Sequence, residues 1–254
     1  AAKLAVHWFE SKQNEVAAEV ADLFSKYRLS EALMAVYKLF WDEFSSWYLE
    51  MIKPAYGQGI DRTTYDATLC FLDNLLHLLH PFMPFITEEL WQQMYERNAE
   101  EGESLMVSAL SMDTYVDTAF VAQFEVVKGV ISNIRSIRLQ KNIAQKEPLD
   151  LQVLGENPVA EFNAVIQKMC NLSSITVVES KAEGASSFMV GTTEYAVPLG
   201  NMIDVEAEIA RMEAELKHKE GFLQGVLKKL SNEKFVNNAP AAVLEMERKK
   251  QADA

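Results

Sequence analysis

Residues 30–52 read SEALMAVYKLFWDEFSSWYLEMI. Ser30 suits the N-cap of a helix, and Pro54 stands just beyond the expected end. Between them the apolar side chains recur every three or four residues: Leu33, Val36, Tyr37, Phe40, Trp41, Phe44, Trp47, Tyr48 and Met51. This spacing predicts one long helix with a wide apolar arc, which is typical of a helix buried in a bundle.

The aromatic side chains of this helix allow two interpretations. They are Tyr37, Phe40, Trp41, Phe44, Trp47 and Tyr48. Such rings either fill the core of a bundle or stack on nucleotide bases. The width of the arc favours the core, with one or two rings at the rim free to contact a nucleotide.

The segments around this helix are helical in pattern as well. Residues 12–27 are amphipathic, and residues 63–80 place leucines at helical spacing. A further helix is expected to be capped by Thr87, and residues 99–118 form a polar connector. We therefore predict an antiparallel helical bundle with its connector over residues 1–118.

The apolar period changes in the following eighty residues. Alternation of apolar and polar side chains there predicts short strands. The expected elements are a helix over 119–142, a strand over 149–153, a helix over 157–170, a strand over 175–177 and a hairpin over 188–197. Together they predict a small α/β module over residues 119–200.

The segment from Val205 to Leu230 has a heptad pattern. Its positions step by four and three, and Lys219 alone interrupts the apolar series: Val205, Ile209, Met212, Leu216, Lys219, Leu223, Val226 and Leu230. Such a seam packs lengthwise against another helix. Asn237-Asn238 before Pro240 predicts a turn and the start of a shorter returning helix. We predict a truncated coiled-coil arm over 201–254, in which the unpaired seam favours self-association of the fragment.

The composition excludes several classes of protein. The chain has 254 residues, of which 49% are hydrophobic, as expected of a globular protein. No apolar run approaches the roughly 20 residues of a membrane span, and no secretory signal is visible. The net charge of −13 argues against an indiscriminate polyanion binder such as a DNA-coating protein. The two widely separated cysteines, Cys70 and Cys170, fit a reducing cytoplasm.

Positive charge is nevertheless concentrated locally. Residues 1–200 hold fifteen Lys/Arg against twenty-seven Asp/Glu, yet residues 126–146 hold five basic residues and no acid. Arg135, Arg138 and Lys141 step round one side of the expected helix and form either a ridge facing RNA phosphates or a solvated basic face. The arm adds five candidate RNA contacts, at positions where coiled coils also carry charge for solubility: Lys217, Lys228, Lys229, Lys234 and Arg248.

No catalytic constellation is visible. The chain has no Gly-rich phosphate loop and no Cys-x-x-Cys pair. Cys70, His77 and His80 lack a fourth ligand at metal spacing, so no metal is predicted. The Glu88-Glu89 pair points about 100° apart on a helix and is explained by the helix dipole.

Four blocks of the sequence resemble the valyl-tRNA synthetase family. The block HPFMPFITEELW is similar to the helical bundle of class I anticodon-binding domains, and a block in the arm is similar to the valyl-specific coiled coil. The bundle motif alone leaves isoleucyl and leucyl relatives open, whereas the arm selects valyl. The blocks are Arg28–Pro54, His80–Trp91, Ile134–Arg138, and Lys229–Phe235 with Ala239-Pro240 and Glu247-Arg248.

The resemblance implies a mainly α fold with a small α/β module. Its parts are a class I anticodon-binding bundle, a mixed α/β stem-contact-like module and a truncated coiled-coil hairpin. It implies that the fragment binds tRNA(Val) and positions it for ATP-dependent attachment of valine by an N-terminal catalytic domain. The motifs of that domain, His-Ile-Gly-His and Lys-Met-Ser-Lys-Ser, are absent here, so the fragment is expected to be non-catalytic. ATP and Mg²⁺ are implied only for the catalytic domain, and the full-length enzyme is implied to be a cytoplasmic monomer.

Charge alone suggests three contacts on the anticodon side, namely Lys12, Arg28 and Lys53. Two competing hypotheses remain at this point. One is a helical interaction scaffold that oligomerises through the heptad helix, and the weaker one is an independent enzyme.

Overall fold

The computed structural model describes residues 1–94, 104–110, 112–200, 205–231, 244–246 and 249. The contacts between residues divide the chain into two units, residues 1–198 and 199–254. The predicted bundle and the predicted α/β module therefore lie in one unit. The prediction of a domain boundary at 118 stays a prediction.

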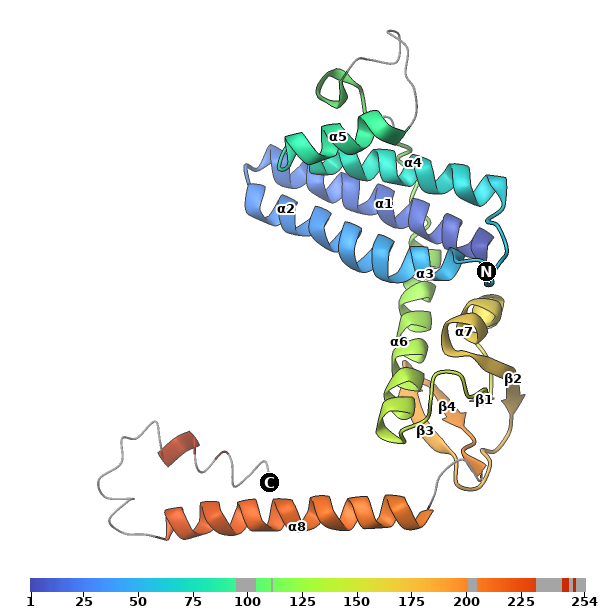
Figure 1. Cartoon of the computed structure of the whole chain (residues 1–254), viewed down its shortest axis with the longest axis vertical. Coiled ribbons are helices and arrows are strands. Elements are labelled where there is room, and N and C mark those ends of the chain that lie inside the picture. Colours follow the sequence, from blue (N-terminus) through green and yellow to red (C-terminus); the bar gives the residue numbers. More distant parts are fainter. Residues whose placement is uncertain (95–103, 111, 201–204, 232–243, 247–248, 250–254) are drawn as a thin grey trace. The chain divides into compact units, whose positions relative to one another are not determined.

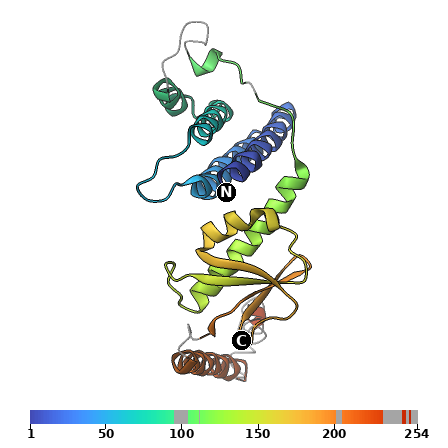
Figure 2. The same cartoon turned by 90° about the vertical axis from the view of Figure 1, so that its right-hand side faces the viewer.

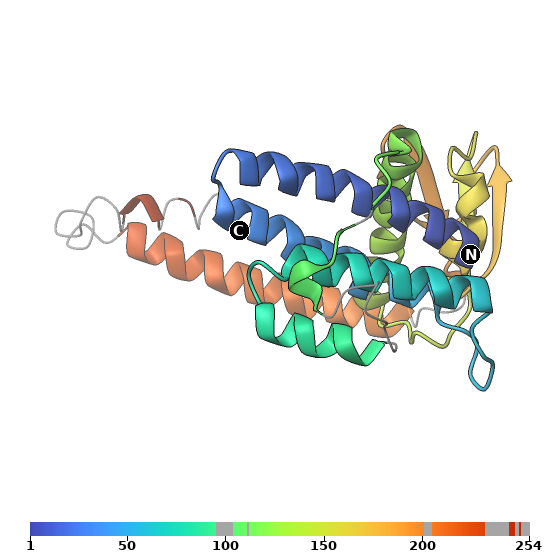
Figure 3. The same cartoon turned by 90° about the horizontal axis from the view of Figure 1, so that it is seen from above.

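The first unit begins with a helical bundle. Helices α1, α2, α4 and α5 run in alternating directions (Figure 1), with η1 and α3 continuing α2, and Figure 3 shows these four helices lying side by side. Helix α1 contacts both α2 and α4, and α4 contacts α5. The predicted antiparallel bundle is confirmed. Its helices are α1 (Ala2–Ser25), α2 (Leu29–Lys38), η1 (Leu39–Tyr48), α3 (Leu49–Ile52), α4 (Arg62–Leu79) and α5 (Pro84–Met94).

The helix predicted over 30–52 differs from the prediction at its start and in its middle. Arg28 is the N-cap and makes no side-chain cap hydrogen bond, so the expected cap at Ser30 is wrong. The middle segment, η1, is a π-helix, whose wider turns contain an extra residue. This extra residue changes which side faces the core. The buried residues are Ala32, Val36 and Leu39 before the shift, and Phe44, Tyr48 and Met51 after it.

The phase shift also decides which aromatic rings enter the core. Phe44 and Tyr48 are buried, and their rings lie 5.3 and 5.0 Å from that of Phe9 on α1. Tyr37 and Trp41 are instead 52% and 58% exposed, with parallel rings 6.4 Å apart. Tyr37 and Trp41 are therefore the rings at the rim, and the core interpretation holds for Phe44 and Tyr48.

Helix α5 begins earlier than predicted. It starts at Pro84, and Thr87 is a buried residue inside it that donates a hydrogen bond to the Met83 carbonyl at 2.8 Å. Thr87 is therefore not a cap. Glu88 accepts hydrogen bonds from Ser104 Oγ at 2.9 Å and from the Leu105 amide at 3.0 Å. Glu88 thus holds the short helix η2 (Leu105–Val107) against α5.

Helix α6 (Thr118–Gln140) joins the bundle to the α/β module (Figure 1). The Asp117 side chain caps it by accepting a hydrogen bond from the Phe120 amide at 3.0 Å. In its first half, the Phe124 ring lies 4.2 Å from that of Trp8 on α1. In its second half, a Cβ atom on Gly129 would lie 3.0 Å from a methyl group of Val190, so glycine permits close packing on the sheet.

The module is a four-stranded mixed sheet in the order β2-β1-β4-β3. Strands β1 and β2 are parallel and are connected through α7, while β3 and β4 form a hairpin. Figure 2 shows α6 and α7 packed beside the sheet. The predicted strands and hairpin are confirmed. The elements are β1 (Leu149–Leu154), η3 (Ala160–Phe162), α7 (Asn163–Cys170), β2 (Leu172–Val178), β3 (Ser186–Val190) and β4 (Thr193–Val197).

The second unit contains the predicted heptad helix as α8 (Val205–Leu230). Among its seam positions, Val226 is buried and Leu216 is 58% exposed. The predicted turn at 237–240 lies outside the described residues. No helix in the described part of the chain is long and apolar enough to cross a membrane.

Candidate nucleic-acid interface

The basic residues of α6 fall into three different environments. Lys128 is almost enclosed, with 11% of its side chain exposed. Its ammonium nitrogen forms ion pairs with Glu43 at 2.6 Å and with Glu125 at 2.8 Å, and lies 5.1 Å from the centre of the Trp8 ring. Lys128 therefore has its charge neutralised inside the protein and fastens α6 to the bundle.

Arg135, two turns further along, is exposed. Its guanidinium carbon lies 5.6 Å from the centre of the Trp47 ring, a cation–π distance. Among the described residues, Arg135 donates no hydrogen bond and forms no ion pair. The ring thus supports an arginine whose donors all remain available to an anion.

Arg138 does not face solvent, which corrects the expectation that it contacts RNA phosphates. It is 1% exposed, and its guanidinium donates to the carbonyls of Ala144 at 2.9 Å, Cys170 at 2.7 Å and Asn171 at 3.3 Å. Burial lowers the pKa of Arg138. The residue joins the end of α7 to the loop that follows α6.

The loop after α6 is held in place from two sides. Besides the Arg138 contact to Ala144, the side-chain Nδ2 of Asn171 donates to the carbonyls of Gln145 at 3.2 Å and Lys146 at 3.0 Å. A hollow of about 410 Å³ lies beside this loop and has Arg135 in its lining. Lys141, at the start of the loop, is half-buried.

A second hollow, of about 720 Å³, lies where the bundle meets the module. We call it the junction hollow. Its lining brings together Lys53 after α3, Arg135 on α6 and Lys168 on α7, with Glu50 and Asp61 as the acids. Lys53 and Arg135 were predicted separately, for different reasons, and the fold places them in one concavity.

Lys168 is the functional candidate that the sequence analysis missed. Its ammonium nitrogen donates to the carbonyl oxygens of Met51 at 2.6 Å and Lys53 at 2.5 Å. Burial lowers its pKa. The sequence predicts a helix over 157–170 but contains no signal that connects it with the end of a helix 115 residues earlier.

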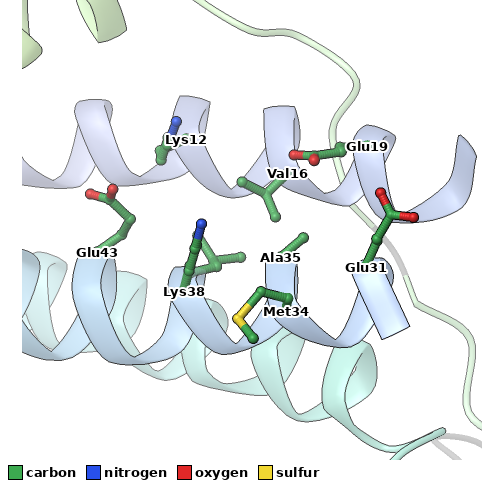
Figure 4. A pocket seen from close by; sticks show the side chains of 9 residues that line it. Lys12, Val16, Glu19, Glu31, Met34, Ala35, Lys38 and Glu43 are labelled. Atoms are coloured by element: carbon green, nitrogen blue, oxygen red, sulfur yellow. The ribbon is translucent and has the colours of Figure 1, made fainter. Parts of the chain in front are cut away.

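All three anticodon-side candidates are paired with neighbouring acids. Lys53 bonds Glu50 at 2.5 Å. Lys12 forms an ion pair with Glu15 at 2.7 Å. Arg28 donates hydrogen bonds to Glu31 from two guanidinium nitrogens, Nε at 2.6 Å and Nη2. Figure 4 shows Lys12 in a groove between α1 and α2 that also contains Glu19, Glu31 and Glu43. More acids than bases line this groove, so it is unsuited to a phosphate.

The candidates on the arm are only partly described. Lys217, Lys228 and Lys229 are exposed on α8. Lys234 and Arg248 lie outside the described residues. Their expected contacts with RNA stay predictions.

The residues considered for a metal site serve other purposes. His77 has its ring nitrogens within hydrogen-bond distance of the Asp73 carbonyl at 2.9 Å and Ser108 Oγ at 2.7 Å, and His80 bonds Thr87 at 2.8 Å. Cys70 is exposed. Within the described residues, no group of three or more His, Cys, Asp or Glu side chains is arranged to hold a metal ion.

Comparison with known families gives two matches along the chain. Residues 6–153 match the family described as the anticodon-binding domain of tRNA ligase, from α1 into β1. Residues 204–254 match the family described as the valyl tRNA synthetase tRNA binding arm.

Individual relatives agree with these matches. A valine–tRNA ligase of Bacteroides thetaiotaomicron is 99% identical over 254 residues, which is all of this chain and 29% of the relative's length. One from Phocaeicola vulgatus is 72% identical over 253 residues, again 29% of its length. A more distant one, from Enterococcus faecalis, is 35% identical over 98% of this chain. The chain thus spans less than a third of the relatives that it matches.

Proposed function

This chain belongs to the family of anticodon-binding domains of tRNA ligases, and we propose that it is the tRNA-binding carboxy-terminal portion of a cytoplasmic valine–tRNA ligase. Its partner is tRNA(Val), and its role is to hold the tRNA so that the acceptor end reaches a catalytic domain in the remainder of the protein. The chain itself contributes positioning and no chemistry.

The observation that carries the proposal is the environment of Arg135. In a unit whose net charge is strongly negative, this guanidinium is exposed, supported by Trp47 and unpaired among the described residues. It lines both hollows, so an RNA strand crossing either one passes its donors. Arginine at such a position forms bidentate hydrogen bonds to phosphate. Lys53 on the bundle side of the junction hollow is a second exposed cation, ion-paired with Glu50 at 2.5 Å.

The experiment compares tRNA binding by Arg135→Gln with a matched arginine variant. Arg62 is also exposed and also stacked on an aromatic ring, with its guanidinium carbon 5.8 Å from the centre of Tyr65, but it is ion-paired with Asp66 at 2.9 Å. Filter binding of tRNA(Val) and of a non-cognate tRNA is measured at several salt concentrations for R135Q and R62Q in the full-length ligase.

We expect R135Q to weaken binding to both tRNAs. The negative slope of log K against log salt should become shallower by about 1. R62Q should leave the slope and the affinity unchanged. Equal behaviour of the two variants would remove Arg135 from the interface. Equal affinity of the unsubstituted protein for both tRNAs would remove tRNA(Val) as the specific partner.

The exposed part of the α8 seam supports a narrower proposal for the isolated fragment. Leu216 is 58% exposed on a helix whose heptad pattern calls for a partner helix. We infer that the fragment self-associates through this seam. Sedimentation equilibrium should show a dimer that Leu216→Glu weakens, whereas a monomer at all concentrations would contradict the inference.

A further inference from the structure

Within the described residues, both α6 and α7 of the module contact the bundle. Helix α6 packs on the bundle through Phe124 and Lys128 and continues into the module. Helix α7 contributes Lys168, whose ammonium group bonds the carbonyls of Met51 and Lys53 at the end of α3. A single helix can bend and twist along its axis. A second contact away from that axis therefore restrains the angle between the two parts.

The end of α3 presents carbonyl acceptors to such a donor. The last carbonyls of a helix have no partner within the helix. The Lys53 amide still bonds the Leu49 carbonyl at 3.2 Å, but the next residue, Pro54, has no amide hydrogen to offer. The chain turns away at Lys53, with ψ at 123°. Lys168 supplies its positive charge at the negative end of the helix dipole.

The Lys168 contact also borders the junction hollow. Lys53 lies on the bundle side of this hollow, Arg135 lies on α6, and Lys168 lies on the module side. A change in the angle between bundle and module would move Lys53 relative to Arg135. The spacing of these cations has to match the spacing of phosphates along a strand if both are to bind one RNA.

We propose that Lys168 is a positioning residue for RNA binding, which caps α3 and thereby fixes the distance between the cations of the bundle and those of the module. This inference rests on the proposed tRNA-binding function. It makes Lys168 different from Arg135, because Lys168 acts on the shape of the site and not on the phosphate.

The test uses two variants of the full-length ligase. Lys168→Met keeps the length of the side chain and removes its donors, whereas Lys168→Arg keeps donors that can still reach two carbonyls. We expect K168M to weaken tRNA(Val) binding about threefold to tenfold, because the angle between bundle and module then has to be fixed when the tRNA binds. The salt slope should not change, because the same phosphates are contacted. K168R should restore most of the affinity. Valine-dependent ATP–pyrophosphate exchange, which needs no tRNA, should not change.

A distance measurement reports on the angle directly. In the 254-residue chain, one spin label is attached to the exposed Cys70 on α4 and a second to Thr176→Cys on β2. Cys170 is buried, and burial raises its pKa to about 11, so its thiol should not be labelled. We expect the distance distribution to broaden in K168M and to narrow again in K168R.

The outcomes separate the inference from the function on which it rests. A salt slope lowered by about 1 in K168M, with an unchanged distance distribution, would make Lys168 a direct phosphate contact and overturn the inference. Unchanged tRNA affinity in K168M alongside weakened binding in R135Q would overturn the inference alone. Unchanged affinity in both variants would overturn the proposed interface as well.

Discussion

The two halves of α6 present similar basic side chains and use them in different ways. Lys128 in the first half and Arg135 in the second are two helical turns apart, and both lie near the Trp47 ring, at 5.8 and 5.6 Å from its centre. Lys128 is neutralised by Glu43, a residue of the bundle 85 positions earlier in the chain. Arg135 also lies beside the bundle, but no carboxylate is paired with it within the described residues. A basic helix face is thus a candidate RNA-binding surface only where no carboxylate from the rest of the fold pairs with its side chains.

The strongest test of this comparison is removal of Arg138. We expect Arg138→Met to destabilise the chain by about 3 kcal/mol, because several carbonyl groups lose a charged donor. The measurement is urea unfolding, followed by circular dichroism. Arg138→Lys, which keeps the charge but has a single nitrogen, should be intermediate. A normally stable R138M protein that has lost tRNA binding would instead make Arg138 a phosphate contact.

Lys128 provides the next test. Lys128→Met leaves Glu43 unpaired with only 18% of its side chain exposed, and we expect a loss of about 2 kcal/mol in the free energy of unfolding. The double variant K128M/E43M should recover much of this loss, since neither charge then remains. Binding of tRNA should not change in either variant. A reduced salt slope in K128M would show that the two halves of α6 are alike after all.

The large elements of this fold were predictable from the sequence, because helical periodicity and strand alternation are local signals. The bundle helices, the hairpin and α8 all follow such patterns. The π-helix η1 was not predictable in this way. It inserts its extra residue without changing the apolar composition, so Tyr37 and Trp41 fit the core pattern and yet lie on the surface.

The candidate site was predictable only in part. The absence of acids from residues 126–146 pointed to Arg135, and this signal was local. The burial of Arg138 depends on carbonyls of Cys170 and Asn171, more than thirty positions away. The capping of α3 by Lys168 spans an even longer separation. Contacts of this kind depend on how elements pack, and a single sequence does not contain that information.

The smallest expected effect concerns the start of α6 and depends on pH. Hydrogen bonds from the Phe120 amide, and secondarily from His7, lower the pKa of Asp117 below its ordinary value. A carboxylate with a lowered pKa stabilises the fold above its unfolded-state pKa, and that stabilisation is lost as the pH falls through its native pKa. Asp117→Asn should therefore unfold at a lower urea concentration than the unsubstituted chain at pH 7. The difference should shrink on acidification and vanish below the native pKa. A constant difference across this range would mean that Asp117 acts through the shape of its cap and not through its charge.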